Sequence, residues 1–326
     1  MAAADQIKSL IKSFGEGDEN RFYATAMQIA ANEARNGHLA LAQELKNIID
    51  KAKIAKSHGT AIVRTLPINT AQKELNDLLE LTHPKEKLKE MVLAPKVDKA
   101  LRRVLDEQRK IDILRQNNLF PRKKLLFTGP PGCGKTLSAR VLASELAIPL
   151  FIIRLDGLIS RYMGESIAKL RLIFEAMHQF RAVYLFDEFD SIGTTRTQGN
   201  DVGEIKRVLN TFLLQIEKDD SNSLIIAATN LPESLDVALF RRFDDIIQYP
   251  LPTKEEILKL YKSELADFKL TKKFNLKNVS TESVGLSFAD VHRICEDIVK
   301  DILVYGHKDI SEELIISYAH QRKNPF

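Results

Sequence analysis

The chain has 326 residues, and its 48 basic and 44 acidic side chains leave a formal net charge of only +4 at pH 7. Such a balance gives no overall field for nucleic acid or membrane, so we expect neither as a partner. Hydrophobic residues make up 44% of the chain, which is enough for the cores of two or three domains. Two cysteines, Cys133 and Cys295, give no disulfide framework. With no signal-like N-terminus and no run of membrane-spanning length, we expect a cytoplasmic protein.

Residues 1–56 show helical periodicity and predict a small N-terminal helical bundle. Its apolar stripes fit either core packing or the docking of a partner. Residues 57–84 are the expected linker, which begins with glycine and proline in a segment without sustained periodicity. A helical pattern follows within it over 71–81. The expected helices of the bundle are Asp5–Phe14, Asp18–Arg35 and His38–Ile54.

Residues 85–252 alternate apolar runs with helical patterns, after a long amphipathic helix expected over 96–115. This alternation predicts an α/β fold, a P-loop parallel sheet with helices on both faces. Residues 253–326 read as a small C-terminal helical lid. The expected strands are Lys124–Thr128, Leu150–Leu155, Val183–Asp187, Leu224–Thr229 and Asp245–Tyr249, and the expected lid helices are Lys254–Asp267, Phe288–Tyr305 and Ser311–Gln321.

A glycine-rich stretch between the first of these strands and the next helix predicts a phosphate-binding loop. Its glycines let backbone N–H groups curl around the β-phosphate, where the N-terminus of the helix adds positive potential. Lys135 would reach the β- and γ-phosphates, and the Thr136 hydroxyl would bind Mg²⁺. We therefore expect ATP with Mg²⁺ as ligands. The expected nucleotide contacts are Gly129, Pro130, Pro131, Gly132, Cys133, Gly134, Lys135, Thr136 and Leu137.

Polar side chains follow two further strands. Asp187, at the end of one buried run, would hold Mg²⁺ through water, and Glu188 would polarise the water that attacks the γ-phosphate. Asp190 continues this acidic edge and is expected to be structural. Asn230 follows another strand, and its amide could donate to the γ-phosphate or orient the attacking water. These positions predict hydrolysis of the bound nucleotide.

Arg241 and Arg242 lie where a paired arginine suits an arginine finger, which neutralises transition-state charge. From about residue 85 to 322, these motifs together resemble the AAA family of ATPases. In that family the finger comes from the neighbouring subunit of a ring, so the resemblance implies a homo-oligomer, usually a hexamer. The loop departs from the pattern Arg-x-Gly-Arg-Phe-Asp-Arg: it is shortened, and Asp245 stands where a further arginine often occurs. Either arginine could therefore reach the nucleotide.

The resemblance extends to the segment 160–166, which is similar to the first pore loop of AAA translocases. There Tyr162 and Met163 could grip an extended polypeptide by apolar contact. A second loop around 193–201 could also face the pore, and Arg207 could cross the subunit boundary. The resemblance thus implies a protein substrate.

The lid departs from many relatives, because Ala289 or Asp290 stands where they carry a nucleotide-sensing arginine. His292 nearby is expected to be structural. Val92 and Leu93, ahead of the first core strand, could pack on adenine.

The N-terminal bundle and the segments 155–165, 201–210 and 239–245 narrow the resemblance. They are similar to bacterial AAA ATPases encoded beside subtilisin-like serine proteases, which implies such a protease as a partner. The chain itself has neither a His-Glu-x-x-His motif nor a Gly-x-Ser-x-Gly motif, so any proteolysis must come from elsewhere.

Three functions are compatible with these residues. The first is an ATP-hydrolysing ring that remodels or translocates a protein through a central pore and works with, or regulates, a separate protease. The alternative is a nucleotide-gated scaffold or regulator of a partner enzyme, without threading. A DNA motor is the third, although the chain lacks a basic stripe interleaved with aromatic residues.

Overall fold

The structure is a computed structural model that describes residues 19–35, 37–38, 41–47, 49, 75, 77–158, 165–193, 201–266, 268, 274–305 and 310–323. Its contacts divide the chain into two compact units, Met1–Ile62 and Val63–Phe326. The expected helix Asp5–Phe14 and residues 57–74 of the expected linker lie outside the described residues. Within the described part of the chain, no helix has both the length and the apolar character needed to cross a membrane.

The first unit contains α2, Glu19–Arg35, which confirms the second predicted helix. Gly37 follows it with a φ of +89°, a left-handed conformation that glycine adopts without strain, and its N–H donates to the Ala34 carbonyl at 3.2 Å. Residues 41–47 and 49 are also helical, within the range predicted for the third helix. The apolar stripes are thus partly buried inside this unit.

A six-stranded sheet forms the centre of the second unit, with the order β1-β3-β4-β5-β2-β6. Every neighbouring pair in this sheet is parallel except β1 with β3. The phosphate loop follows β2, which lies between β5 and β6. The strands are β1 Leu79–Thr82, β2 Lys124–Thr128, β3 Leu150–Ile153, β4 Val183–Phe186, β5 Leu224–Thr229 and β6 Asp245–Gln248.

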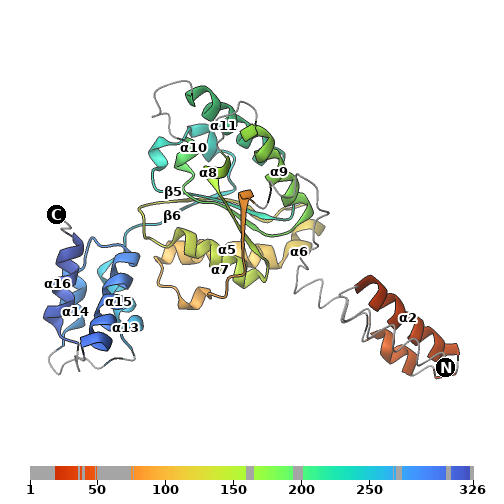
Figure 1. Cartoon of the computed structure of the whole chain (residues 1–326), viewed down its shortest axis with the longest axis horizontal. Coiled ribbons are helices and arrows are strands. Elements are labelled where there is room, and N and C mark those ends of the chain that lie inside the picture. The colour runs from red at the N-terminus through yellow and green to blue at the C-terminus, as the bar shows by residue number, and fades with distance from the viewer. Residues whose placement is uncertain are drawn as a thin grey trace. The chain divides into compact units, whose positions relative to one another are not determined.

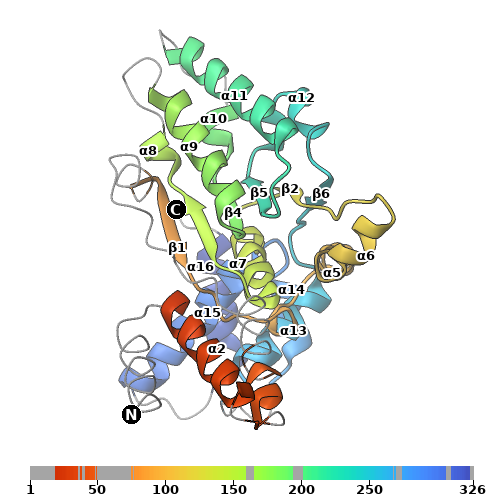
Figure 2. The ribbon, with the colours of Figure 1, turned by 90° about the vertical axis from the view of Figure 1, so that its right-hand side faces the viewer.

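Alternate residues of the buried strands face two helical layers. Leu125 and Phe127 belong to the core formed with α5 and α7, whereas Leu126 belongs to the core formed with α9 and α11. Figure 1 and Figure 2 show these helices on opposite faces of the sheet. Because both faces are covered, the strands are apolar throughout, which confirms the predicted α/β sheet. The helices of this core are α5 Pro95–Arg109, α6 Ile111–Gln116, α7 Lys135–Leu146, α8 Leu155–Leu158, α9 Glu165–Gln179, α10 Asp190–Gly193, α11 Asp201–Lys218 and α12 Val237–Phe240, with the 3₁₀ turns η1 Leu88–Glu90 and η2 Pro232–Ser234.

Four helices after the sheet form the lid: α13 Lys254–Glu264, α14 Leu276–Glu282, α15 Phe288–Tyr305 and α16 Glu312–Lys323. They share a core of their own, in which Ile257, Ile294 and Ile315 are fully buried. The three predicted lid helices are present, and α14 was not predicted. With 7 residues, α14 is too short to show helical periodicity.

Two sequence-based expectations were wrong. The segment 71–81, expected to be helical, contains β1 from Leu79, and β1 pairs with β3 at the sheet edge, inside the range expected as linker. Its partner strand lies about 70 residues further on, so no local pattern could show the pairing. The single helix expected over 96–115 is two helices, because Lys110 leaves the helical conformation with φ of −108° and ψ of 25°.

Candidate nucleotide-binding site

A cavity of about 570 Å³ lies beside the phosphate loop, between the ends of the core strands and the lid. Three loop glycines, Gly129, Gly132 and Gly134, have φ values of +139°, +72° and +93°. These conformations strain any residue with a side chain, so the glycines are needed for the loop to turn into α7. The resulting loop presents backbone N–H groups at a helix N-terminus, which is an anion-binding arrangement.

The loop residues divide between the cavity wall and its support. Residues 131–137 line the cavity. Gly129 and Pro130 instead offer their carbonyl oxygens to Lys135, whose Nζ lies 2.7 Å and 2.8 Å from them. The Lys135 side chain is buried, and this burial lowers its pKa.

Lys135 also reaches across the sheet to Asn230. Its Nζ lies 2.7 Å from the Asn230 Oδ1, at the end of β5. All three acceptors of the ammonium are neutral oxygens. Because a charged acceptor forms a stronger hydrogen bond, an incoming phosphate can compete for this group.

Thr136 and Asp187 form the second contact between loop and sheet. The Thr136 hydroxyl donates to Asp187 Oδ2 at 2.7 Å, and Asp187 Oδ1 accepts the Glu188 N–H at 3.0 Å. Hydroxyl and carboxylate oxygens suit Mg²⁺. Among the described residues, no group of three His, Cys, Asp or Glu side chains could hold a metal ion. A Mg²⁺ ion held by this pair would therefore need nucleotide and water oxygens as well.

Glu188 has a left-handed backbone with a φ of +50°. For a residue with a Cβ this conformation costs roughly 1–2 kcal/mol, and such strain concentrates at functional sites. The Glu188 side chain is exposed and lines the same cavity. Its carboxylate is thus free to accept a proton from a water molecule.

Asp190 orients the end of β5. Its Oδ1 accepts the Thr229 hydroxyl at 2.9 Å and the Asn230 N–H at 3.3 Å. We expected Asp190 to be structural, and these contacts agree with that expectation. They also give it a particular task, since they hold the backbone from which Asn230 reaches Lys135.

The adenine end of the cavity draws on segments far apart in the chain. Val92 and Leu93 line it, as does His292 of the lid, which is half exposed with its Nδ1 2.9 Å from the Glu264 Oε1. Sequence analysis missed the other lining residues because none belongs to a motif; of these, only Met91 adjoins a residue that we singled out. The missed residues are Glu90, Met91, Leu260, Glu264 and Phe288.

The two arginines do not line this cavity. Arg242 is held by its own chain: its Nη1 donates to the Ala238 carbonyl at 2.9 Å, and its Nε lies 3.6 Å from the Glu217 Oε2. Arg241, at the end of α12, is exposed. Tyr162 and Met163 lie outside the described residues, as do residues 194–200 of the expected second loop.

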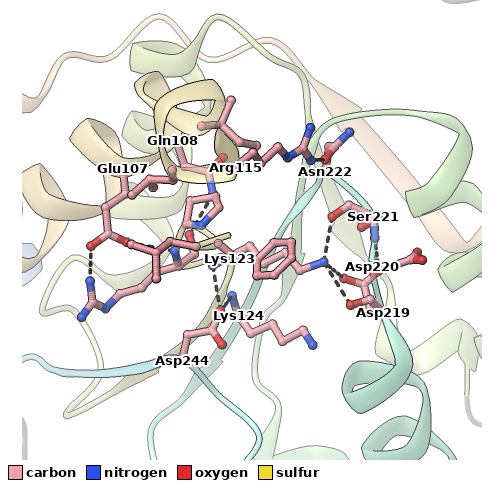
Figure 3. A pocket seen from close by; sticks show the side chains of 16 residues that line it. Glu107, Gln108, Arg115, Lys123, Lys124, Asp219, Asp220, Ser221, Asn222 and Asp244 are labelled. Carbon is pink, nitrogen blue, oxygen red and sulfur yellow. Dashed lines mark hydrogen bonds and ion pairs between the residues drawn. The ribbon is translucent and has the colours of Figure 1, made fainter. Parts of the chain in front are cut away.

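A second cavity, of about 630 Å³, opens at the opposite edge of the sheet, where β2, β5 and β6 begin (Figure 3). Its charged groups are bonded to one another. The Lys123 Nζ lies 2.6 Å from Asp219 Oδ2 and 2.7 Å from the Ser221 carbonyl, and Asp244 Oδ2 accepts the N–H groups of Lys123 and Lys124, each at 2.9 Å. These contacts hold the strand starts together and do not converge on a ligand, so the candidate site is the phosphate-loop cavity.

The sheet order and the glycine-rich loop after β2 define a P-loop α/β fold. Residues 125–251 match the family model described as ATPase family associated with various cellular activities (AAA). The chain is 34% identical over 313 residues to an uncharacterized AAA family ATPase of Sinorhizobium fredii, a match that covers 96% of this chain and 93% of that protein. The chain therefore belongs to the AAA family of ATPases.

Two further likenesses concern the core. The chain is 35% identical over 187 residues to a katanin p60 ATPase-containing protein of Rattus norvegicus, which is 54% of this chain and 38% of that protein. The crystal structure of the FIGL-1 AAA domain is similar with a TM-score of 0.62 at 23% identity, over 80% of this chain and 91% of that chain. At this identity the structural likeness supports the AAA fold alone.

Proposed function

We propose that this protein binds ATP with Mg²⁺ and hydrolyses it to ADP and phosphate. One observation carries the proposal. Lys135, Thr136, Asp187, Glu188 and Asn230, which come from three separate parts of the chain, line one cavity. Two 2.7 Å hydrogen bonds, Lys135 to Asn230 and Thr136 to Asp187, already join the loop to the strand ends.

Each side chain has a task that its surroundings favour. The Lys135 ammonium would exchange neutral oxygens for phosphate oxygens. Thr136 and Asp187 would hold Mg²⁺, which neutralises phosphate charge when bound. Glu188 would take the proton of the attacking water. Asn230, with its Oδ1 on Lys135, would have its amide nitrogen left to donate to the γ-phosphate.

We also propose that the active site is completed in a homo-oligomeric ring, a hexamer by analogy with the family. Phosphoryl transfer gains from an arginine near the transferred group, yet neither Arg241 nor Arg242 lines the cavity of its own chain. Arg242 is held by Ala238 and Glu217, whereas Arg241 is exposed. Arg241 is therefore our candidate for the finger that enters a neighbouring subunit.

The proposed substrate is a protein that the ring remodels or pulls through its pore by Tyr162 and Met163, with a subtilisin-like protease as partner. Sequence resemblance alone supports this part. Its test is the stimulation of ATP turnover by an unfolded polypeptide, reduced and carboxymethylated lactalbumin. Tyr162→Ala should abolish the stimulation and Tyr305→Ala, on an exposed residue of α15, should keep it. Equal stimulation of both variants would contradict threading.

The proposed hydrolysis is tested by steady-state ATP turnover per subunit over a wide range of protein concentration. Glu188→Gln serves as the blank, because it keeps the loop contacts but removes the base. Glu233→Gln, on an exposed residue outside the cavity, is the matched control. Turnover that rises steeply with concentration supports sites completed between subunits. Tight ATP binding with flat or absent turnover would contradict this mechanism and favour the nucleotide-gated regulator.

A further inference from the structure

The phosphate loop touches the lid directly through its backbone. The Ala289 N–H, in the first turn of α15, donates to the Gly132 carbonyl at 3.0 Å. There is no room for a side chain between them. A Cβ on Gly132 would lie 2.5 Å from the Ser287 Oγ and 3.0 Å from the Ala289 Cβ. Loop and helix are therefore in close contact at this point.

The first turn of α15 is fixed by its own cap. Asp290 Oδ2 accepts the Ser287 N–H at 3.0 Å and the Ser287 hydroxyl at 2.6 Å, and the Asp290 N–H lies 3.2 Å from the Ser287 Oγ. The N–H groups of a first turn have no partner within the helix. The Ala289 N–H is thus available to the loop without any cost to α15.

A second contact ties the loop to the segment that leads into the lid. Tyr249 follows β6 and precedes Pro250-Leu-Pro252, where the lid chain begins. Its N–H donates to the Thr128 carbonyl at 2.7 Å, and a Cβ on Gly129 would overlap the Tyr249 carbonyl oxygen. The first loop glycine therefore lies against the lid's connecting segment, and Gly132 lies against the lid itself.

The Gly132 carbonyl belongs to the same peptide unit as the Cys133 N–H. A trans peptide is planar and rigid, so these two groups point in opposite directions and move together. In the proposed function, the Cys133 N–H faces the phosphates. A hydrogen bond accepted by the carbonyl also polarises the N–H of the same unit, so the two contacts strengthen each other.

We propose that this peptide unit couples the lid to the nucleotide: phosphate binds one side of it and Ala289 of the lid binds the other. The inference rests on the proposed function. Ala289 acts as a positioning residue through its backbone, at the place where a side-chain arginine is absent. Because coupling between two binding events is reciprocal, phosphate binding favours the docked lid and the docked lid tightens nucleotide binding.

The test is Ala289→Pro, which removes the N–H. Proline is accepted in a first helical turn, where its missing N–H has no partner within the helix. Ala289→Gly keeps the N–H and is the matched control. Two quantities are measured: the affinity for fluorescent mant-ADP, and the distance between labels at Lys99 of α5 and Lys259 of α13, both exposed, without and with ADP.

We expect Ala289→Pro to weaken mant-ADP binding about 5- to 10-fold, the effect of one lost hydrogen bond. The label distance should no longer respond to ADP in this variant, whereas Ala289→Gly should respond like the wild type. Wild-type affinity and response in Ala289→Pro would overturn the coupling. Absence of mant-ADP binding in the wild type would instead contradict the proposed function, so the two failures are distinguishable.

A double-mutant cycle provides a second test, which holds if Ala289→Pro fails to fold. Gly132→Ala places a methyl group against Ser287, and Ser287→Gly makes room for it. The left-handed φ of Gly132 keeps part of the cost in both backgrounds. We expect the double variant to bind mant-ADP more tightly than Gly132→Ala alone. Strictly additive losses would show that the loop and α15 are not in contact in solution.

Discussion

The Nζ atom of Lys135 lies 2.7 Å from the Oδ1 atom of Asn230, so that residues 95 positions apart join the start of α7 to the end of β5. This bond gives the ammonium a partner in the absence of a phosphate. It also places the Asn230 amide beside the group that we expect to bind the γ-phosphate. The two strand ends are thereby arranged before any ligand binds.

Asn230→Ala should lower ATP turnover about 10- to 100-fold, because a hydrogen bond to a charged group contributes about 1.5–3 kcal/mol. Binding should fall less, since the loop N–H groups remain. Initial rates and mant-ATP titrations measure the two effects. Asn222→Ala, which alters a residue of the second cavity, is the control. A variant with normal turnover would show that Asn230 has no part in the reaction.

Arg241→Ala and Arg242→Ala should differ. Removing a finger lowers turnover about 10³-fold or more, which we expect for Arg241. Arg242→Ala should mainly lower thermal stability, because that side chain bonds to Ala238 and lies near Glu217. The measurements are turnover and melting temperature for each variant. The reverse pattern would assign the finger to Arg242.

Mixing Lys135→Ala with Arg241→Ala subunits should restore part of the turnover. In a mixed ring, some interfaces pair an intact phosphate loop with an intact arginine. Turnover is measured across mixing ratios, with size-exclusion chromatography to show that mixed rings form. Rings that form and stay inactive at every ratio would contradict an arginine acting between subunits.

Both cysteines should react slowly in the folded protein. Burial raises the pKa of the Cys133 thiol, and it raises that of Cys295 to about 12. An unfolded cysteine has a pKa of about 8.5, so at pH 8 far less reactive thiolate exists in the folded state. Colorimetric titration with a thiol reagent should show two fast thiols in denaturant and none without it. Cys295→Ser should leave one.

The same shifts set a pH dependence of stability. A thiol whose folded pKa is raised favours the folded state below its unfolded pKa, and that contribution is lost as pH rises through the folded value. The free energy of unfolding should therefore fall above about pH 8.5. Urea unfolding at several pH values measures this, and Cys295→Ser should flatten the dependence. An unchanged slope in Cys295→Ser would contradict the assignment to Cys295.

Lys123→Met should destabilise the core. The Asp219 side chain is fully buried and lies 2.6 Å from the Lys123 Nζ, so the substitution leaves a carboxylate without its cation (Figure 3). Breaking a buried pair in this way costs about 3–5 kcal/mol. Asp220→Ala alters the exposed neighbouring acid and should change stability by no more than about 0.5 kcal/mol. Urea unfolding compares them, and equal losses would contradict a structural pair.

Much of the core could be predicted from local patterns. The phosphate loop depends on glycine positions between a strand and a helix, and continuous apolar runs indicate strands buried on both faces. Helices α2 and α15 carry clear periodicity over 17 and 18 residues. By contrast, the strand at Leu79–Thr82 depends on its pairing with β3, and its four residues carry too little pattern to exclude a helix.

Sequence analysis could also place Lys135, Asp187 and Asn230 at strand or loop ends, because the carboxyl ends of parallel strands meet at one edge of a sheet. Which atoms bond depends on the strand order, which brings β5 beside β2 and β4. The same holds for Arg242 beside Glu217 and for Gly132 beneath Ala289. Motif chemistry is encoded within a few neighbouring residues, whereas contacts between distant segments arise only when the chain packs.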